Sequence, residues 1–295
     1  YRVDLLNSAL TLGSCQEALN IRLTPSCVSS YNRMFVTRVV PARNYKYFHE
    51  TLIPDLNHRI GGDVEEEEWR IVGGNSVTIQ EIPYQVMYGL YCGGSLIAPN
   101  WVITAAHCKD KDNLVYVGST FRSKAVPYQI CAHFFHPLWN ISTNPHSHDY
   151  DYQLLLLEKS VPVTSSSRPI AIGNLEDVRP GNLVSVSGWG HMKYKERKMQ
   201  ELLRRVFIPV VDENVCRNLP HGQYKNITER MICVGLLNGT KDACQGDSGG
   251  PAVVHGKLVG LVSFGIGCAL PDMPGVYSLI PAVRDWIRTV TALPL

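Results

Sequence analysis

Short apolar runs separated by Gly, Pro and Asn residues recur along the sequence from residue 83 onward, and they limit the available folds more than any other feature. Runs of about four to eight such residues, bounded by turn residues, are typical of strands in sandwiches or barrels. A final stretch places Val283, Trp286, Ile287 and Val290 on one face of a helix. The pattern therefore predicts an all-β domain with a C-terminal helix. The predicted strands are 83–88, 94–97, 101–104, 114–117, 154–157, 183–188, 205–211, 251–254, 258–264 and 275–279.

The composition is that of a globular protein, with 45% hydrophobic and 18% charged residues. No stretch of about 18 apolar residues is present, so we expect no transmembrane helix and no membrane partner. The formal net charge of +2 gives no reason to expect a nucleic-acid partner. The basic run 193–198 has the composition of a nucleic-acid patch, but we interpret it as a solvated loop.

The run Gly246-Asp247-Ser248-Gly249-Gly250-Pro251 carries the strongest chemical signal. A serine hydroxyl is a weak nucleophile, so it needs an adjacent base and donors for the charge that develops on the substrate oxygen. Glycines beside it let the backbone turn tightly and point N–H groups at a reacting carbonyl. The sequence supplies a histidine within Thr104-Ala105-Ala106-His107-Cys108 and an aspartate within Asp149-Tyr150-Asp151.

The order His107, Asp151, Ser248, with these flanking residues, resembles the chymotrypsin/trypsin family of serine endopeptidases over residues 71–295. The resemblance implies two antiparallel six-stranded β-barrels with a C-terminal α-helix and an active site between the barrels. It implies that Ser248 is the nucleophile, His107 the base and Asp151 its orienting carboxylate. The N–H groups of Gly246 and Ser248 would form the oxyanion hole. Asp149 is a rival for the third role, and we prefer Asp151 because the family aspartate directly precedes an apolar strand.

The resemblance also implies a substrate specificity. Trypsin-like members carry an aspartate six residues before the nucleophile, where this chain has Asp242. A buried carboxylate at that point selects Arg or Lys, because other side chains leave it unpaired. Gly265 and Gly275 match the wall glycines of the pocket, and Phe264 replaces a common tryptophan as an apolar wall. Ala243 lacks the hydroxyl that some relatives have, so we expect Arg to be preferred to Lys.

Two regions are predicted, divided at Arg70. Residues 1–70 form a poorly structured leader of unknown fold, with one candidate strand at 36–40 and an acidic linker at 63–69. Residues 71–295 form the protease domain, which begins with Ile71-Val72-Gly73-Gly74. By the resemblance, cleavage after Arg70 frees the Ile71 amine, which then pairs with Asp247. The uncut chain is then a zymogen, which needs an activating protease. Arg70 suits the enzyme's own pocket, although the neighbouring glutamates argue against efficient self-cleavage.

The nine cysteines indicate an oxidising compartment. The resemblance assigns the bridges Cys92–Cys108, Cys216–Cys233 and Cys244–Cys268. Cys15, Cys27 and Cys131 remain. Our preferred interpretation pairs Cys15 with Cys27 and leaves Cys131 unpaired in a strand. The alternative joins the leader to Cys131, so that it stays attached after cleavage.

We expect a secreted glycoprotein, because sequons occur at Asn140, Asn226 and Asn238, although no convincing signal peptide is present in this chain. We expect no cofactor and no metal. The segment 117–130 has no Asp or Glu for calcium, and we interpret His146, His148 and Asp149 as a polar rim of the cleft rather than as metal ligands.

The expected partners are protein substrates with Arg or Lys before the cut, an activating protease and protein inhibitors. Two alternatives to a general endopeptidase stay open. One is a regulatory protease that acts on one partner protein through its leader. The other is a non-catalytic binding protein on the same fold.

Overall fold

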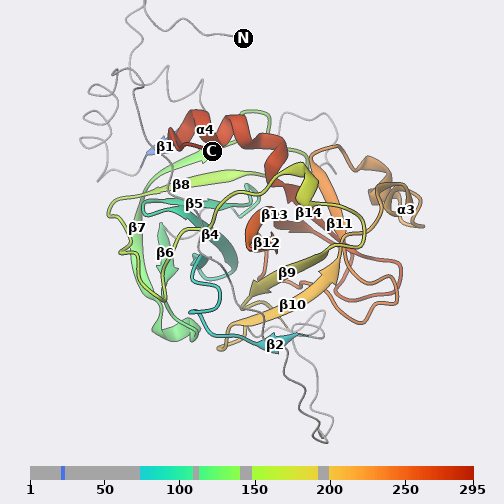
Figure 1. Cartoon of the computed structure of the whole chain (residues 1–295), viewed down its shortest axis with the longest axis horizontal. Helices are drawn as coiled ribbons and strands as arrows, with labels where there is room; N and C mark the ends of the chain where they lie inside the picture. Colours follow the sequence, from blue (N-terminus) through green and yellow to red (C-terminus); the bar gives the residue numbers. More distant parts are fainter. Residues whose placement is uncertain (1–20, 24–73, 109–112, 140–147, 192–198) are drawn as a thin grey trace, which may run out of the picture.

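The computed structural model describes residues 21–23, 74–108, 113–139, 148–191 and 199–295. These residues contain two antiparallel sheets of seven strands each (Figure 1). The first sheet has the order β1-β7-β6-β3-β4-β5-β8, and β7 also pairs with β8. Six strands therefore close into a barrel, with β1 added outside it. The strands are β1 (Ile21–Leu23), β3 (Gln85–Tyr88), β4 (Cys92–Ala98), β5 (Trp101–Thr104), β6 (Leu114–Val117), β7 (Val126–Phe135) and β8 (Gln153–Leu157).

The second sheet has the order β11-β14-β13-β12-β9-β10-β2. A single bridge between Val210 and Val234 joins its far sides, because Val210 directly follows β10 and Val234 ends β11. Six strands thus form a second barrel, and the short β2 lies outside β10. The strands are β2 (Asn75–Ser76), β9 (Leu183–Gly188), β10 (Arg204–Pro209), β11 (Met231–Val234), β12 (Pro251–Val254), β13 (Lys257–Phe264) and β14 (Gly275–Leu279).

Each barrel has its own apolar interior, and a third cluster joins the two. Strand β6 shows the alternation that builds such an interior, since Val115 and Val117 are buried while their neighbours are half-exposed. The cluster between the barrels includes Ile103 of β5 and Leu261 of β13, together with Ile287 of the C-terminal helix α4 (Arg284–Thr291). The helix therefore seals the junction with the apolar face that the sequence predicts. A short helix α3 (Glu213–Arg217) lies after β10, with the Asp212 side chain as its N-cap.

The predicted all-β fold of two barrels with a C-terminal helix is confirmed, and all ten predicted strands are present with small shifts at some ends. Three strands of the domain were missed. In β7, Pro127 and the polar residue His133 interrupt the apolar pattern, so the segment does not read as a strand. His133 is nevertheless buried, because its ring nitrogen Nδ1 is hydrogen-bonded to the Gln153 side chain at 3.0 Å. Strand β2 is only two residues long, whereas β11 is a four-residue apolar run, Met231–Val234, that the sequence analysis overlooked. The candidate strand 36–40 lies outside the described residues.

The three expected disulfides, Cys92–Cys108, Cys216–Cys233 and Cys244–Cys268, are all present. The preferred interpretation of Cys131 is wrong, because Cys131 takes part in a disulfide whose partner lies outside the described residues. The reason is visible in the register of β1, an unexpected strand within the leader. Leu23 lies opposite Ala132, so the leader runs alongside the segment of β7 that carries Cys131.

Candidate active site

His107 and Asp151 are joined across the mouth of the first barrel. His107 follows β5 by three residues, and Asp151 precedes β8 by two. The His107 Nδ1 atom lies 2.7 Å from Asp151 Oδ2, and the backbone N–H of His107 donates to Asp151 Oδ1 at 2.8 Å. The bridge between Cys92 and Cys108 fixes the loop that carries His107. The structure therefore brings together the base and the carboxylate that the sequence predicts.

Ser263 of β13 is a site residue that the sequence analysis missed. Its hydroxyl donates to Asp151 Oδ2 at 2.6 Å, so a residue of the second barrel reaches the carboxylate of the first. The available signal was its place beside Phe264 and Gly265, both already assigned to the pocket wall. Asp151 is fully buried, which would raise its pKa, but the hydrogen bonds from His107 and Ser263 lower the pKa below its ordinary value. Burial favours neutral His107, yet Asp151 raises the His107 pKa.

Asp149 has a different partner, so it does not compete with Asp151. Its carboxylate forms an ion pair with Arg230, whose Nη2 lies 2.8 Å from Asp149 Oδ2, and it accepts a hydrogen bond from Thr228 at 3.0 Å. Burial raises the pKa of Asp149, but these partners outweigh burial and lower it. The neighbouring His148 ring stacks on Phe264 at 4.6 Å and stands edge-on to His107 at 6.1 Å. His148 thus lines the rim, and Phe264 supplies an apolar surface there.

Ser248 lies in a turn that only glycines can build around it. Gly246 and Gly249 have φ angles of +96° and +74°. A Cβ on Gly249 would lie 2.2 Å from Thr104 Oγ1 and 2.8 Å from the Gly93 carbonyl, so the turn packs directly on the first barrel. The Gly93 N–H donates to the Ser248 carbonyl at 2.8 Å. Among the described residues, no hydrogen bond joins the Ser248 hydroxyl to His107.

The N–H groups predicted to form the oxyanion hole are unused in this turn. Its other donors are occupied: Asp247 N–H donates to Cys244, Gly249 N–H to Val262 and Gly250 N–H to Asp247. In the described part of the chain, the N–H groups of Gly246 and Ser248 have no such acceptor. Two unused donors on either side of one residue can bind a developing oxyanion.

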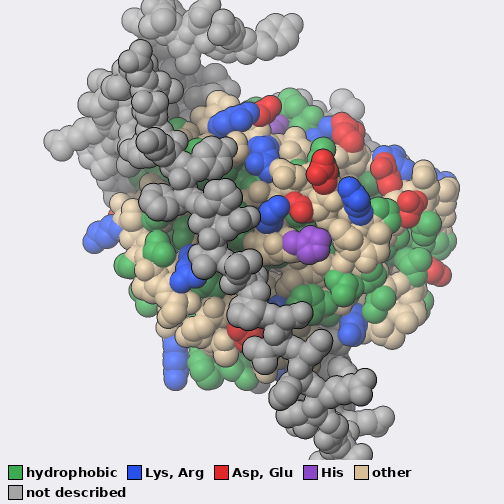
Figure 2. Space-filling model, viewed as in Figure 1, with side chains coloured by type: hydrophobic (Ala, Val, Ile, Leu, Met, Phe, Trp, Pro, Cys, Tyr) green, Lys and Arg blue, Asp and Glu red, His purple; other side chains and the backbone are tan. Residues whose placement is uncertain are grey.

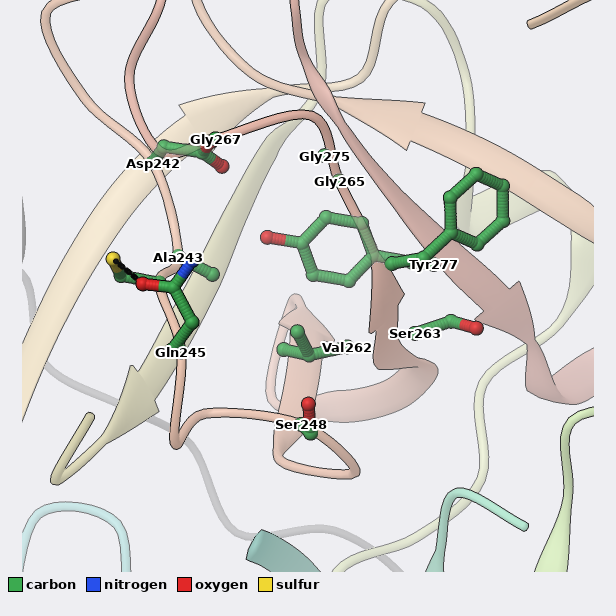
Figure 3. A pocket seen from close by; sticks show the side chains of 12 residues that line it. Asp242, Ala243, Gln245, Ser248, Val262, Ser263, Gly265, Gly267, Gly275 and Tyr277 are labelled. Atoms are coloured by element: carbon green, nitrogen blue, oxygen red, sulfur yellow. Dashed lines mark hydrogen bonds between the residues drawn. The ribbon is translucent and has the colours of Figure 1, made fainter. Parts of the chain in front are cut away.

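A cavity of about 110 Å³ runs from Ser248 to Asp242. Figure 3 shows these two residues at opposite ends of the pocket, with the Tyr277 hydroxyl directed into the space between them. Gly265 and Gly275 are neighbours in the pocket wall, since a Cβ on Gly265 would lie 3.8 Å from the Gly275 Cα. A Cβ on Gly275 would lie 3.1 Å from Asp242 Oδ1. A side chain at either glycine would narrow the pocket, and one at Gly275 would do so beside the Asp242 carboxylate.

Asp242 is 4% exposed, and its two oxygens differ. Oδ2 accepts a hydrogen bond from the Ala269 N–H at 3.1 Å, whereas Oδ1 has no hydrogen-bond partner. The Tyr277 hydroxyl is also buried without a partner. Burial raises the pKa of Asp242 to about 7, and this effect outweighs the opposite effect of the neighbouring Ala269 and Ala243 N–H groups. A buried carboxylate with one unsatisfied oxygen is a site for a donor that the protein does not supply.

Asp247 is also buried, at 1% exposure, and it is not among the residues that line the pocket. Its Oδ1 accepts from the Gly190 N–H at 2.9 Å, and its Oδ2 accepts from the Cys244 N–H at 3.1 Å. Burial raises its pKa to about 6. Within the described residues no cation pairs with it, and its predicted partner Ile71 lies outside them, as do Arg70 and His146.

The Ser248 turn packs on the first barrel through the Gly93 N–H, and Ser263 of the second barrel reaches Asp151, so the serine and the Asp151–His107 pair meet where the two barrels pack. These groups at the junction of two β-barrels define the class of serine endopeptidases. Such an enzyme acts on protein substrates. The described residues contain no group of three or more His, Cys, Asp or Glu side chains that could hold a metal ion. No helix in the described part of the chain is long and apolar enough to cross a membrane.

Comparisons with known proteins agree with this class. The sequence model of the Trypsin family matches residues 71–287. A trypsin of Simulium vittatum is 42% identical over 226 residues, which cover 71% of this chain and 88% of that protein. The Bombyx mori vitellin-degrading protease is 40% identical over 239 residues, which cover 77% and 88%. Among solved structures, mouse neuropsin, a serine protease, aligns with a TM-score of 0.68 and 32% identity over 74% of this chain and 98% of its own.

The chain therefore belongs to the trypsin family of serine proteases.

Proposed function

We propose that this chain is the zymogen of a secreted trypsin-like endopeptidase that is activated by cleavage after Arg70 and then cuts peptide bonds after Arg and Lys. One observation carries the specificity: the unsatisfied Oδ1 of Asp242 at the end of the pocket opposite Ser248. A guanidinium or ammonium group that enters the pocket gives this oxygen its missing donor. An uncharged side chain leaves the carboxylate buried and unpaired, which is costly.

The catalytic steps follow from the residues described. Ser248 attacks the scissile carbonyl carbon, and His107 takes the hydroxyl proton. The N–H groups of Gly246 and Ser248 then donate to the oxyanion. His107 returns the proton to the leaving amine, which departs as the acyl-enzyme forms. Asp151, held by Ser263, keeps the His107 ring in the required tautomer and stabilises its protonated form.

The specificity is tested with Asp242→Asn in the cleaved enzyme. We expect kcat/KM on an Arg-amide substrate to fall by about 10⁴-fold, because the pocket loses the charge that binds the substrate. Asp272→Asn is the matched control, since Asp272 is exposed and its backbone, at φ +57°, tolerates asparagine. An Asp242→Asn enzyme that cleaves after Arg at the wild-type rate would refute the proposed pocket.

The proposed activation depends on Asp247. Its carboxylate is buried without a cation in the described structure, and a new amine at Ile71 would provide one. The match to the family model also begins at Ile71. We expect Arg70→Gln to stay inactive after limited trypsin treatment, whereas the parent chain gains Arg-amidase activity together with an N-terminus at Ile71. Activity that appears without an Ile71 terminus would contradict this route.

Secretion is proposed from two features. The described domain contains three disulfides. The sequons at Asn226 and Asn238 are exposed, while Asn140 lies outside the described residues. Figure 2 shows acidic and basic side chains interspersed on the described part of one face.

A regulatory role stays a second candidate, since the leader contacts the barrel through β1. Cleavage of casein compared with cleavage of a single-site zymogen substrate distinguishes the two roles. Protein inhibitors that present an Arg or Lys to the pocket are expected partners of either enzyme.

A further inference from the structure

The peptide between Gln245 and Gly246 is held by a segment outside the Ser248 turn. The backbone N–H of His191 donates to the Gln245 carbonyl at 2.7 Å. In a trans peptide the carbonyl and the N–H that follows it point in opposite directions. This hydrogen bond therefore directs the Gly246 N–H, one of the two proposed oxyanion donors, away from His191.

The Met199 side chain contacts Gly246 directly. A Cβ on Gly246 would lie 2.5 Å from the Met199 Sδ, 2.9 Å from its Cε and 3.0 Å from the Gly190 Cα. The thioether thus occupies the space beside the Gly246 backbone that a side chain there would need. The Gln200 N–H donates to the Trp189 carbonyl at 2.8 Å, which holds Met199 beside Gly190.

Met199 combines this contact with partial exposure. It is half-buried, whereas Met87 and Met231 are only 4% and 7% exposed. Met273 is also half-buried, but it lies in the loop before β14, where it forms a bridge with Leu270. Oxidation turns an accessible thioether into a sulfoxide, which is larger, polar and able to accept hydrogen bonds. Met199 is therefore both open to an oxidant and placed to affect Gly246.

We infer that Met199 is an oxidation site through which peroxides lower the catalytic rate, because its sulfoxide blocks the Gly246 N–H. A sulfur lone pair takes one oxygen atom from hydrogen peroxide. The S–O bond forms as the O–O bond breaks, so the sulfur is oxidised by two electrons and the peroxide is reduced to water. The Gly246 N–H has no acceptor in the described part of the chain, so the new oxygen competes with the substrate oxyanion for it. This inference rests on the oxyanion role of Gly246 in the proposed function.

The first test follows Gly246 and needs no activity. The full chain with Ser248→Ala is labelled with ¹³C at glutamine carbonyls and ¹⁵N at glycine, which selects the one Gln-Gly pair of the sequence, Gln245-Gly246. We expect hydrogen peroxide to shift this amide signal in step with oxidation of Met199, as measured by mass spectrometry. The signal should not move when the same chain carries Met199→Leu. A Gly246 signal that stays in place after Met199 is fully oxidised would overturn the inference.

The second test measures the rate of the cleaved enzyme. We expect kcat on an Arg-amide substrate to fall by about 10²-fold when Met199 is oxidised, which is the cost of losing one oxyanion donor. The affinity for benzamidine should change less than about threefold, because Met199 does not line the Asp242 pocket. Sulfoxide reductases for both epimers should restore kcat. A shifted Gly246 signal with an unchanged kcat would refute the effect on catalysis.

Matched variants identify the methionine responsible. Met199→Leu, Met273→Leu and Met192→Leu are each compared with their own untreated rates, and Met192 lies outside the described residues. We expect peroxide to leave kcat of the Met199→Leu enzyme within about twofold and to inactivate the other two as it does the parent. Inactivation that persists in Met199→Leu, or that is lost in Met273→Leu, would overturn the inference.

Discussion

The buried carboxylates of the two barrels have pKa values that shift in opposite directions. In the first barrel, Asp151 is fully buried, and it receives hydrogen bonds from His107 and Ser263 that hold its pKa below the ordinary value. In the second barrel, Asp242 and Asp247 are as deeply buried, yet burial raises their pKa values to about 7 and about 6. The first site is electrostatically complete, and the second lacks positive charge.

The two kinds of carboxylate differ in where their partners come from. The carboxylate that orients the base is satisfied by the protein itself, so its geometry is set by folding. The other two carboxylates have no cation partner among the described residues, and in the proposed function their partners come from outside: a basic substrate side chain for Asp242 and a new N-terminal amine for Asp247. A buried charge without a partner destabilises the fold, and that instability makes each later partner bind more strongly.

The largest expected effect is on kcat, when the Asp151 carboxylate is replaced. Asp151→Asn should lower kcat by about 10⁴-fold in the cleaved enzyme, because the amide favours the wrong tautomer of His107. Asp149→Asn is the matched control, since Asp149 pairs with Arg230 and does not contact His107. We expect the control to keep kcat within about tenfold of wild type. Steady-state rates on an Arg-amide substrate give kcat for the two variants. An equal loss of kcat in both variants would contradict our assignment of Asp151.

The next effect concerns the stability of the uncut chain. Burial raises the pKa of Asp247 from 3.8 to about 6, so the folded state binds this proton more tightly than the unfolded state does. Stability from this group is therefore full below about pH 4 and is lost as the pH rises through about 6, by about 3 kcal/mol. Against the Ser248→Ala parent, Asp247→Asn should gain about that much between pH 4 and pH 8.

Urea unfolding at the two pH values measures this gain. Asp149→Asn should show the opposite pH dependence of its stability relative to the parent. Its partners lower the pKa of Asp149, so the stabilisation from Asp149 is lost as the pH falls. A constant difference between Asp247→Asn and its parent across the pH range would show that Asp247 is not protonated in the fold.

The sequence predicted the parts of this comparison that depend on local pattern. Strands such as Trp101–Thr104 and Leu183–Gly188 were found to the residue, because apolar runs between turn residues specify them. The resemblance supplied His107, Asp151, Ser248 and Asp242. The contact from Ser263 to Asp151 was missed because it spans 112 residues, and β1 because a three-residue strand has no period to detect. Long-range pairing and the Cys131 bond are properties of the assembled chain.

The charge deficit at Asp242 predicts how the affinity of the pocket for cations depends on pH. The Asp242 pKa of about 7 means that a small amidinium such as benzamidine should bind about tenfold more weakly for each pH unit below 7 and with constant affinity above about 8. Calorimetry on the cleaved chain with Ser248→Ala and His107→Ala measures this affinity without the His107 imidazole, which also titrates at the site. An affinity that stays flat from pH 5 to 8 would place the Asp242 pKa well below 7.

The smallest effect refines the same pocket. Ala243 lines the cavity next to Asp242 and offers no side-chain acceptor. An arginine can use several N–H groups on the single free oxygen and nearby carbonyls, whereas the compact ammonium of lysine gains more from one added acceptor. Ala243→Ser should therefore raise kcat/KM for Lys relative to Arg by about fivefold, which corresponds to one hydrogen bond of about 1 kcal/mol. Paired Lys- and Arg-amide substrates measure the ratio, with the exposed Ala171→Ser as control. An unchanged ratio would mean that position 243 does not contribute to the choice between the two basic side chains.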